Sequence, residues 1–167
     1  MSGFFGEDIQ RPKRKSVEWY TPRWIFDLLG ICFDLDPASP HDMESAVPAT
    51  IKYTVFDDGL KKAWFGCVWL NPPYGRDTPA WIRRFISHGH GIALVFSRTD
   101  AEWCQEIMKS CDAMLFLRGR VDFVPGIENQ HKKSRSGAGT AMFAFGDDCV
   151  SALKNLADRG ILIEASR

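Results

Sequence analysis

Residues 67–97 read CVWLNPPYGRDTPAWIRRFISHGHGIALVFS, and this stretch decides the fold. Its two ends, residues 67–70 and 91–97, are apolar runs with β-branched and aromatic residues, which predicts two buried strands. Between these runs, apolar residues recur at helical spacing: Trp81, Ile82, Phe85 and Ile86. A helix is therefore predicted over residues 78–88. Two buried strands separated by one helix are typical of a parallel pair in one sheet.

The same alternation continues on both sides of this stretch. Upstream, residues 23–30 predict a short helix, and residues 31–35 predict a strand that ends at Asp36. Downstream, a helical pattern that contains Trp103 and Ile107 precedes an apolar run at residues 113–117. The predicted fold is α/β and Rossmann-like, with three layers around a mostly parallel sheet.

The last third of the chain changes character. Residues 121–126 and 140–146 are predicted to form a C-terminal antiparallel strand pair joined by a long exposed loop. A closing helix over residues 149–158 and a short apolar run at 161–163 complete the chain. Residues 37–50 are rich in proline and polar groups and are expected to form a loop.

Length and charge bound the domain organisation. The 167 residues suit one compact domain, which we place at residues 17–167. Residues 1–16 carry several cations without helical or strand periodicity, and we expect a flexible basic arm there. With 21 Lys+Arg against 21 Asp+Glu, overall charge does not indicate a nucleic-acid partner.

Several classes of protein are not expected. The five cysteines are an odd number without Cys-x-x-Cys spacing, and the four histidines show no metal-ligand spacing, so no metal site is predicted. No apolar run approaches the roughly 18 residues that cross a membrane, and residues 1–20 lack the apolar core of a signal peptide. A soluble, cytoplasmic protein is expected, without membrane association and without an obligate protein partner.

The segment Asn71-Pro72-Pro73-Tyr74 follows directly after a predicted strand. In open α/β sheets, ligands bind beyond the carboxyl ends of strands, and the two prolines make this loop stiff. The side-chain oxygen of Asn71 and the carbonyl of Pro72 are acceptors for the two hydrogens of an exocyclic amine, while Tyr74 offers a ring for stacking. Converging acceptors bias an aromatic amine toward a geometry in which its lone pair can attack an electrophile.

This tetrapeptide resembles the signature of S-adenosylmethionine-dependent amino methyltransferases. Four further segments match in order: residues 18–22 (EWYTP), 35–39 (LDPAS), 57–60 (DDGL) with Trp64, and Gly119-Arg120 ahead of Phe123. Together they resemble the phage-type DNA N6-adenine methyltransferases, related to the Dam enzymes, over roughly residues 17 to 146. The resemblance implies S-adenosyl-L-methionine as the cofactor and double-stranded DNA as the partner.

The resemblance also implies roles for individual residues. Asn71, Pro72, Pro73 and Tyr74 would be catalytic. Cofactor contacts would come from residues around the first strands: Tyr20, Thr21, Pro22, Asp36, and either Asp57 or Asp58. The Thr-Pro segment would hold the methionine end, Asp36 would face the cofactor amine or orient its loop, and one of the paired acids would accept from the cofactor adenine. From residue preference alone, the pair Asp57-Asp58 with Gly59 favours an ordinary turn.

The expected activity is methylation of adenine N6 in DNA by a site-specific DNA-methyltransferase, with the base swung out onto Tyr74 and no general base. Alternatives are methylation of cytosine N4, methylation of a protein glutamine, and a DNA-binding accessory module without catalysis. Two departures from the usual cofactor-binding pattern favour the accessory module. No glycine-rich turn follows the first strand. Asn71 also follows Asp36 by only 35 positions (71 − 36), which leaves little room for the usual strand-helix unit and its ribose-binding acid. The predicted fold is therefore trimmed relative to the usual methyltransferase.

A basic cluster in the predicted C-terminal loop is a candidate DNA contact. Lys132, Lys133 and Arg135 stand beside small, flexible residues, which suits binding to phosphates. Charged loops are more often solvated surface, so this prediction needs a direct binding measurement.

Overall fold

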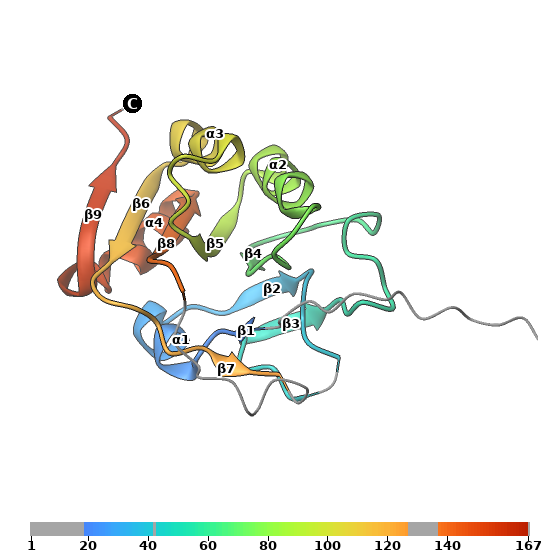
Figure 1. Cartoon of the computed structure of the whole chain (residues 1–167). Coiled ribbons are helices and arrows are strands. Elements are labelled where there is room, and N and C mark those ends of the chain that lie inside the picture. Colours follow the sequence, from blue (N-terminus) through green and yellow to red (C-terminus); the bar gives the residue numbers. More distant parts are fainter. Residues whose placement is uncertain (1–18, 42, 127–136, 167) are drawn as a thin grey trace, which may run out of the picture.

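A computed structural model describes residues 19–41, 43–126 and 137–166 (Figure 1). Its main feature is a seven-stranded sheet with the strand order β3-β2-β4-β5-β8-β6-β9. The strands are β2 (Phe33–Asp36), β3 (Ala49–Lys52), β4 (Val68–Leu70), β5 (Gly91–Phe96), β6 (Ala113–Leu117), β8 (Thr140–Phe145) and β9 (Gly160–Glu164). A second sheet contains only β1 (Trp19–Tyr20) and β7 (Val124–Pro125).

The strand-helix-strand unit predicted from residues 67–97 is present. Strands β4 and β5 are parallel, with Val68 opposite Gly91, and helix α2 (Thr78–His88) connects them. Strand β2 is parallel to both β3 and β4, whereas β8 is antiparallel to β5 and β6, and β9 is antiparallel to β6. The sheet is therefore mixed, and only β8 and β9 run against the common direction.

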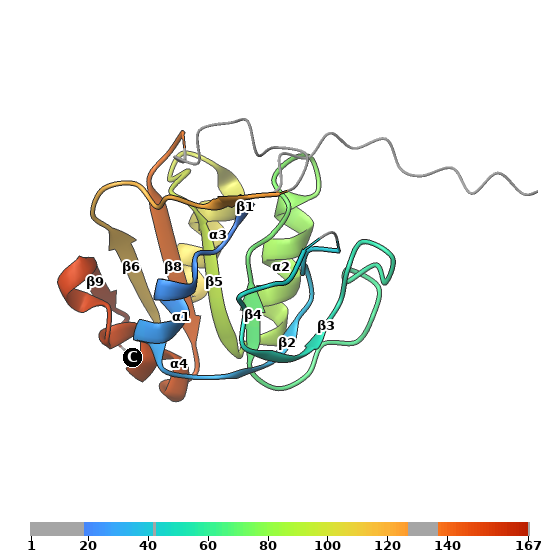
Figure 2. The same ribbon diagram turned by 90° about the horizontal axis from the view of Figure 1, so that it is seen from below.

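Helices cover both faces of this sheet (Figure 2). Helices α2 and α3 (Glu102–Ser110) pack on one face, and helices α1 (Arg23–Leu29) and α4 (Asp147–Lys154) pack on the other. Neighbouring strand residues alternate between the two cores: Trp69 lies with α1 and α4, whereas Val68 and Leu70 lie with α2 and α3. A strand buried on both faces must be apolar at every position, which accounts for the continuous runs in the sequence. The three-layer α/β prediction is confirmed.

The predicted pairing of residues 121–126 with 140–146 is wrong. Strand β7 pairs with β1, with Trp19 opposite Pro125, and β8 is inserted between β5 and β6. The reason lies in the burial of β8, because all six of its residues are buried and it therefore belongs inside the sheet. Pro125 cannot donate to a ladder, so β7 is limited to a two-residue strand.

The chain between β2 and β4 is short, as expected from the spacing of Asp36 and Asn71. Its described residues contain strand β3 and no helix. The apolar patterns of the sequence do not predict strand β3, because it is an edge strand with only one partner and three of its four residues are exposed. Such a strand lacks the apolar pattern of a buried one.

The helices of this fold are short, and α2 has 11 residues. Within the described residues, no helix is both long and apolar enough to cross a bilayer.

Candidate active site

The predicted site residues gather at one edge of the sheet. Strands β2, β4 and β5 are parallel, so their carboxyl ends, which lead into Pro37, Asn71 and Ser97, meet at the same edge. The small β1-β7 sheet crosses this end, near the start of β8 (Figure 2). The β1 segment thereby contacts the loop after β4, and β7 is joined to it through β1.

Asn71 is oriented by the β1 segment. Its Nδ2 donates to the carbonyl oxygen of Trp19 at 2.9 Å and to Thr21 Oγ1 at 3.3 Å. Because two acceptors surround one end of the amide, that end is the nitrogen, and the oxygen points away from Trp19 and Thr21. Asn71 Oδ1 is buried and has no hydrogen-bond partner within the part of the chain that the structure describes. A buried acceptor without a donor costs free energy, so this oxygen is a site where an incoming N–H is favoured.

The rest of the loop is stiffened by Thr78, the first residue of α2. Thr78 is buried, and its hydroxyl donates to the carbonyl of Pro73 at 3.1 Å and accepts from the N–H of Gly75 at 2.9 Å. Pro72 is buried, whereas Pro73 is exposed. The loop conformation is therefore held by two fixed proline φ angles and by one enclosed hydroxyl.

The hydroxyl and the ring of Tyr74 both contact Phe96 at the end of β5. Its hydroxyl accepts from the N–H of Phe96 at 3.1 Å, and its ring stacks on the ring of Phe96 with centroids 4.0 Å apart and planes at 15°. Burial raises the pKa of the Tyr74 hydroxyl well above its usual range, so it stays neutral. One ring face is thus taken by Phe96, and only the other face remains for the predicted stacking on a base.

Asp36 ends β2 in an enclosed position. The residue is 2% exposed, and burial raises its pKa from 3.8 to about 7. The Ala38 N–H at 3.2 Å, the Ser39 hydroxyl and the charge of Lys52 act in the opposite direction but do not cancel the burial. This carboxylate lacks a close full countercharge in the described structure, so a cationic group brought near it would favour its charged form.

The other predicted cofactor residues near β1 lie at the same edge. Thr21 is buried and accepts from Asn71, while Pro22 is buried and precedes α1. Tyr20 is half-buried in β1. The structure therefore brings this segment directly against the loop after β4.

Asp57 and Asp58 are occupied by local contacts. Asp57 accepts from the N–H and hydroxyl of Thr54 and pairs with Lys62 Nζ at 2.6 Å, and these hydrogen bonds, led by that from Lys62, lower its pKa to about 2. Asp58 adopts a left-handed φ of 54° and pairs with Lys61 at 2.8 Å. The geometry is that of a salt-bridged turn, the simpler of the two interpretations of this segment.

This turn nevertheless lies close to the predicted cofactor loop. A Cβ built on Gly59 would stand 2.0 Å from the carbonyl oxygen of Pro37, so only glycine permits the contact. The ring nitrogen of Trp64 donates to the carbonyl of Gly59 at 2.7 Å and fixes the turn from its other side. The LDPAS and DDGL segments, which the sequence separates by about twenty positions, are thus in contact.

A comparison with known families bears on this arrangement. A family model described as DNA N-6-adenine-methyltransferase (Dam) matches residues 9–156. The chain belongs to the Dam family of DNA N-6-adenine-methyltransferases. This finding confirms the resemblance inferred from the NPPY tetrapeptide and its companion segments. Searches of curated proteins and of solved structures find no match.

Membership of the Dam family implies DNA as the substrate, and contacts with DNA phosphates need cationic side chains. Lys132, Lys133 and Arg135, predicted to bind phosphates, lie outside the described residues, as do residues 1–16 of the predicted arm. Among described residues, a surface hollow of about 400 Å³ beside the carboxyl end of β6 is lined by three arginines. They are Arg118, Arg120 and Arg159.

Two residues that contact the NPPY loop, Thr78 and Phe96, were missed in the sequence analysis. The pattern around Thr78 predicts only the start of a helix. A threonine hydroxyl at the start of a helix can nevertheless hydrogen-bond the backbone of the preceding loop, and this signal could have identified Thr78. The pattern around Phe96 predicts only the end of a buried strand, and no local feature indicates that its ring would stack on Tyr74.

Proposed function

We propose that this Dam-family chain transfers a methyl group from S-adenosyl-L-methionine to the exocyclic N6 of adenine in double-stranded DNA. The observation that carries the proposal is the orientation of Asn71. Its nitrogen is bound by Trp19 and Thr21, and its buried oxygen has no partner in the described structure. An exocyclic amine supplies the N–H that this oxygen lacks.

The described residues fit the cofactor at one end. S-adenosyl-L-methionine, when bound, supplies the activated methyl group and carries a positively charged amino group. Asp36 offers a buried carboxylate with incomplete charge compensation, and Thr21 and the start of α1 lie beside the neighbouring loop. A cation near Asp36 would lower its raised pKa, which favours binding. Asp57 and Asp58 already pair with Lys62 and Lys61, so a contact with the cofactor adenine would use the acceptor capacity that these pairs leave free.

The chain's own residues would act by positioning. Asn71 Oδ1 and the carbonyl of Pro72 would accept the two amine hydrogens, and the free face of Tyr74 would stack on the base. No general base is required, because the amine keeps its protons until the methyl group has been transferred and then loses one to solvent. Asn71 Oδ1 is enclosed in this conformation, so entry of a flipped base requires a local rearrangement at this edge.

The test is incubation of the full-length protein with unmethylated DNA and methyl-labelled cofactor, followed by digestion and nucleoside analysis. We expect label in N6-methyladenine. Label in N4-methylcytosine would reassign the target base, and label in protein would reassign the substrate class. DNA binding without cofactor binding in calorimetry, and without label, would overturn the proposal in favour of an accessory module.

A further inference from the structure

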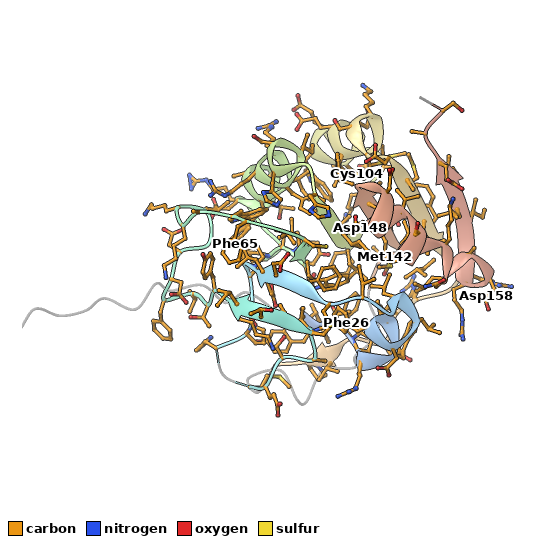
Figure 3. All side chains as sticks on the ribbon, turned by 180° about the vertical axis from the view of Figure 1, so that it is seen from behind. Phe26, Phe65, Cys104, Met142, Asp148 and Asp158 are labelled. Carbon is orange, nitrogen blue, oxygen red and sulfur yellow. The ribbon has the colours of Figure 1, made fainter. Side chains whose placement is uncertain are left out.

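Four potential metal ligands gather at the opposite edge of the sheet from Asn71. Cys67 immediately precedes β4, His90 immediately precedes β5, and Asp148 and Cys149 lie in the first turn of α4. Strands β4 and β5 are parallel, so their first residues lie side by side. Phe145, the last residue of β8, pairs with Gly91, the first residue of β5, so α4, which follows β8, begins at the same edge. Figure 3 labels Asp148 at the beginning of α4.

The donor atoms of this cluster lie close to one another. Cys67 Sγ and Cys149 Sγ are 3.5 Å apart, and His90 Nε2 lies 3.0 Å from each carboxylate oxygen of Asp148. One donor atom from each of the four residues lies within 4.8 Å of the other three. Four ligands around Zn²⁺ at its usual bond lengths would be separated by about 3.3 Å for nitrogen and oxygen and about 3.8 Å for two sulfurs. The observed set needs only modest closure to reach that geometry.

The burial of the cluster distinguishes it from an ordinary surface ion pair. Cys67 and Cys149 are 6% and 0% exposed, whereas the side chains of His90 and Asp148 are 40% and 59% exposed. Two thiols lie inside and two polar ligands lie outside, which gives an ion a path of entry. A Cβ on Gly146 would stand 2.8 Å from the His90 ring, so the glycine (φ 93°) permits this approach.

Two other interpretations explain less. A disulfide needs sulfurs about 2 Å apart, so 3.5 Å corresponds to two separate thiols. Simple core packing accounts for the buried cysteines, but it does not account for a histidine and a carboxylate directed to the same point. Soft thiolate with imidazole is the ligand combination that selects zinc among common cellular divalent ions.

We propose that Cys67, His90, Asp148 and Cys149 bind one Zn²⁺ in a closed tetrahedral structural site. The two thiols lose their protons to solvent as the ion binds, and the bound group then carries two thiolates, a neutral imidazole and a carboxylate. The ion joins the starts of β4 and β5 to the start of α4. This inference does not depend on the proposed methyltransferase activity, because the cluster and Asn71 lie at opposite ends of β4.

The experiment uses full-length protein stripped with a chelator under reducing conditions and titrated with Co²⁺. We expect one equivalent to bind with the visible absorption and sulfur charge-transfer bands of a tetrahedral thiolate site, and Zn²⁺ to displace it. His90→Gln, at a partly exposed ligand that the fold can spare, should weaken binding by more than the roughly 10- to 100-fold that loss of an outer-shell partner causes. Cys149→Ser should weaken the charge-transfer bands to about half, because only the Cys67 thiolate remains, and Cys67→Ser/Cys149→Ser should remove them.

Matched controls come from the other cysteines. Cys104→Ser alters an equally buried thiol in the core between the sheet and α3, and Cys32→Ser alters an exposed one, so both should leave Co²⁺ binding unchanged. The proposal is overturned by binding below one equivalent, by octahedral spectra without charge-transfer bands, or by equal binding in wild type and His90→Gln. A Cys67–Cys149 disulfide found by mass spectrometry in protein purified without oxidant would also overturn it. Circular dichroism identifies any variant that fails to fold, and His90→Gln then decides the question.

Discussion

At the scale of single residues, the proposed function assigns different roles to the two ends of the Asn71 amide. The nitrogen is bound to Trp19 and Thr21, which fixes the orientation of the oxygen without any contribution from substrate. An acceptor oriented before binding loses little free energy to ordering when the amine arrives. The same logic explains why an amide suits this position better than a carboxylate, which has no donor for Trp19.

Replacement of Asn71 tests this division. We expect Asn71→Ala to lower kcat by on the order of 10²- to 10³-fold, as the loss of one preorganised hydrogen-bonding group does in other enzymes. Asn71→Asp keeps an acceptor but places a second oxygen 2.9 Å from the Trp19 carbonyl, so it should be at least as inactive and also less stable. Single-turnover methylation and urea unfolding measure the two effects.

The control for Asn71 is Thr21→Ser, which retains the hydroxyl that accepts from Nδ2. It should remain active. Methylation by Asn71→Ala at a rate close to that of wild type would contradict the assigned role.

We expect Asp36 to make the stability of the ligand-free protein depend on pH. Its folded pKa of about 7 lies above the unfolded value of 3.8, so the folded state retains a proton that the unfolded state releases. The free energy of unfolding should therefore fall as pH rises from about 4 to about 7, by at most about 4 kcal/mol, and then level off. Asp36→Asn should remove this fall and be more stable than wild type above pH 7. Urea unfolding across this pH range is the measurement.

The matched control for Asp36 is Asp158→Asn, which removes one exposed carboxylate far from this enclosed site. If Asp36→Asn and wild type show the same pH dependence, the carboxylate is charged in the folded state and the raised pKa is refuted.

At the scale of elements, the loop after β4 depends on the first residue of the helix that follows it. Thr78→Val keeps the shape but removes the hydroxyl that serves Pro73 and Gly75. We expect a loss of about 1–3 kcal/mol in unfolding free energy, together with a fall in kcat as the loop loosens. Thr78→Ser keeps the hydroxyl and should retain both the unfolding free energy and the kcat of wild type. Equal activity of the Val and Ser variants would show that the hydrogen bonds of this hydroxyl are not required for activity.

The strands buried on both faces and the amphipathic helix α2 were the most predictable from sequence. Helix α2 matches its predicted range of residues 78–88, and strands β4, β5 and β6 lie within or at their predicted runs. These segments carry strong periodic or continuous apolar patterns. Strand β3 was not predicted, because an exposed edge strand has no such pattern. The predicted partner of β8 was wrong, because the local sequence does not indicate which distant strand a strand pairs with.

The candidate site was predictable in part for a similar reason. Asn71, Pro72, Pro73 and Tyr74 form one contiguous segment whose chemistry can be read locally. The Phe96 stack and the Trp19 contact join residues 22 and 52 positions apart, which sequence spacing cannot reveal. The cluster at Cys67 and His90 was hidden in the same way, because its ligands come from three separate elements.

At the scale of the whole molecule, balanced charge means that DNA affinity must come from local cationic groups. The predicted contacts are Lys132, Lys133 and Arg135. Replacing all three by alanine should reduce the slope of log binding constant against log salt by roughly 0.9 for each phosphate that these side chains neutralise. Titration of labelled duplex at several salt concentrations measures this slope.

The control for this variant is Lys154→Ala, which removes a cation that is already paired with Glu164 at 2.8 Å. Its salt dependence should equal that of wild type. An unchanged slope for the triple variant would show that these side chains are ordinary solvated surface.

The central position of β8 has a consequence for synthesis of the protein. Strand β8 fills the gap between β5 and β6 but follows both of them along the chain, so it is translated after them. Until residue 145 has emerged, the facing edges of β5 and β6 lack their partner, and their open ladders can pair with other nascent chains. The seven-stranded sheet should therefore stay incomplete until residues 140–145 have been translated, and fragments that stop short of β8 should accumulate in inclusion bodies.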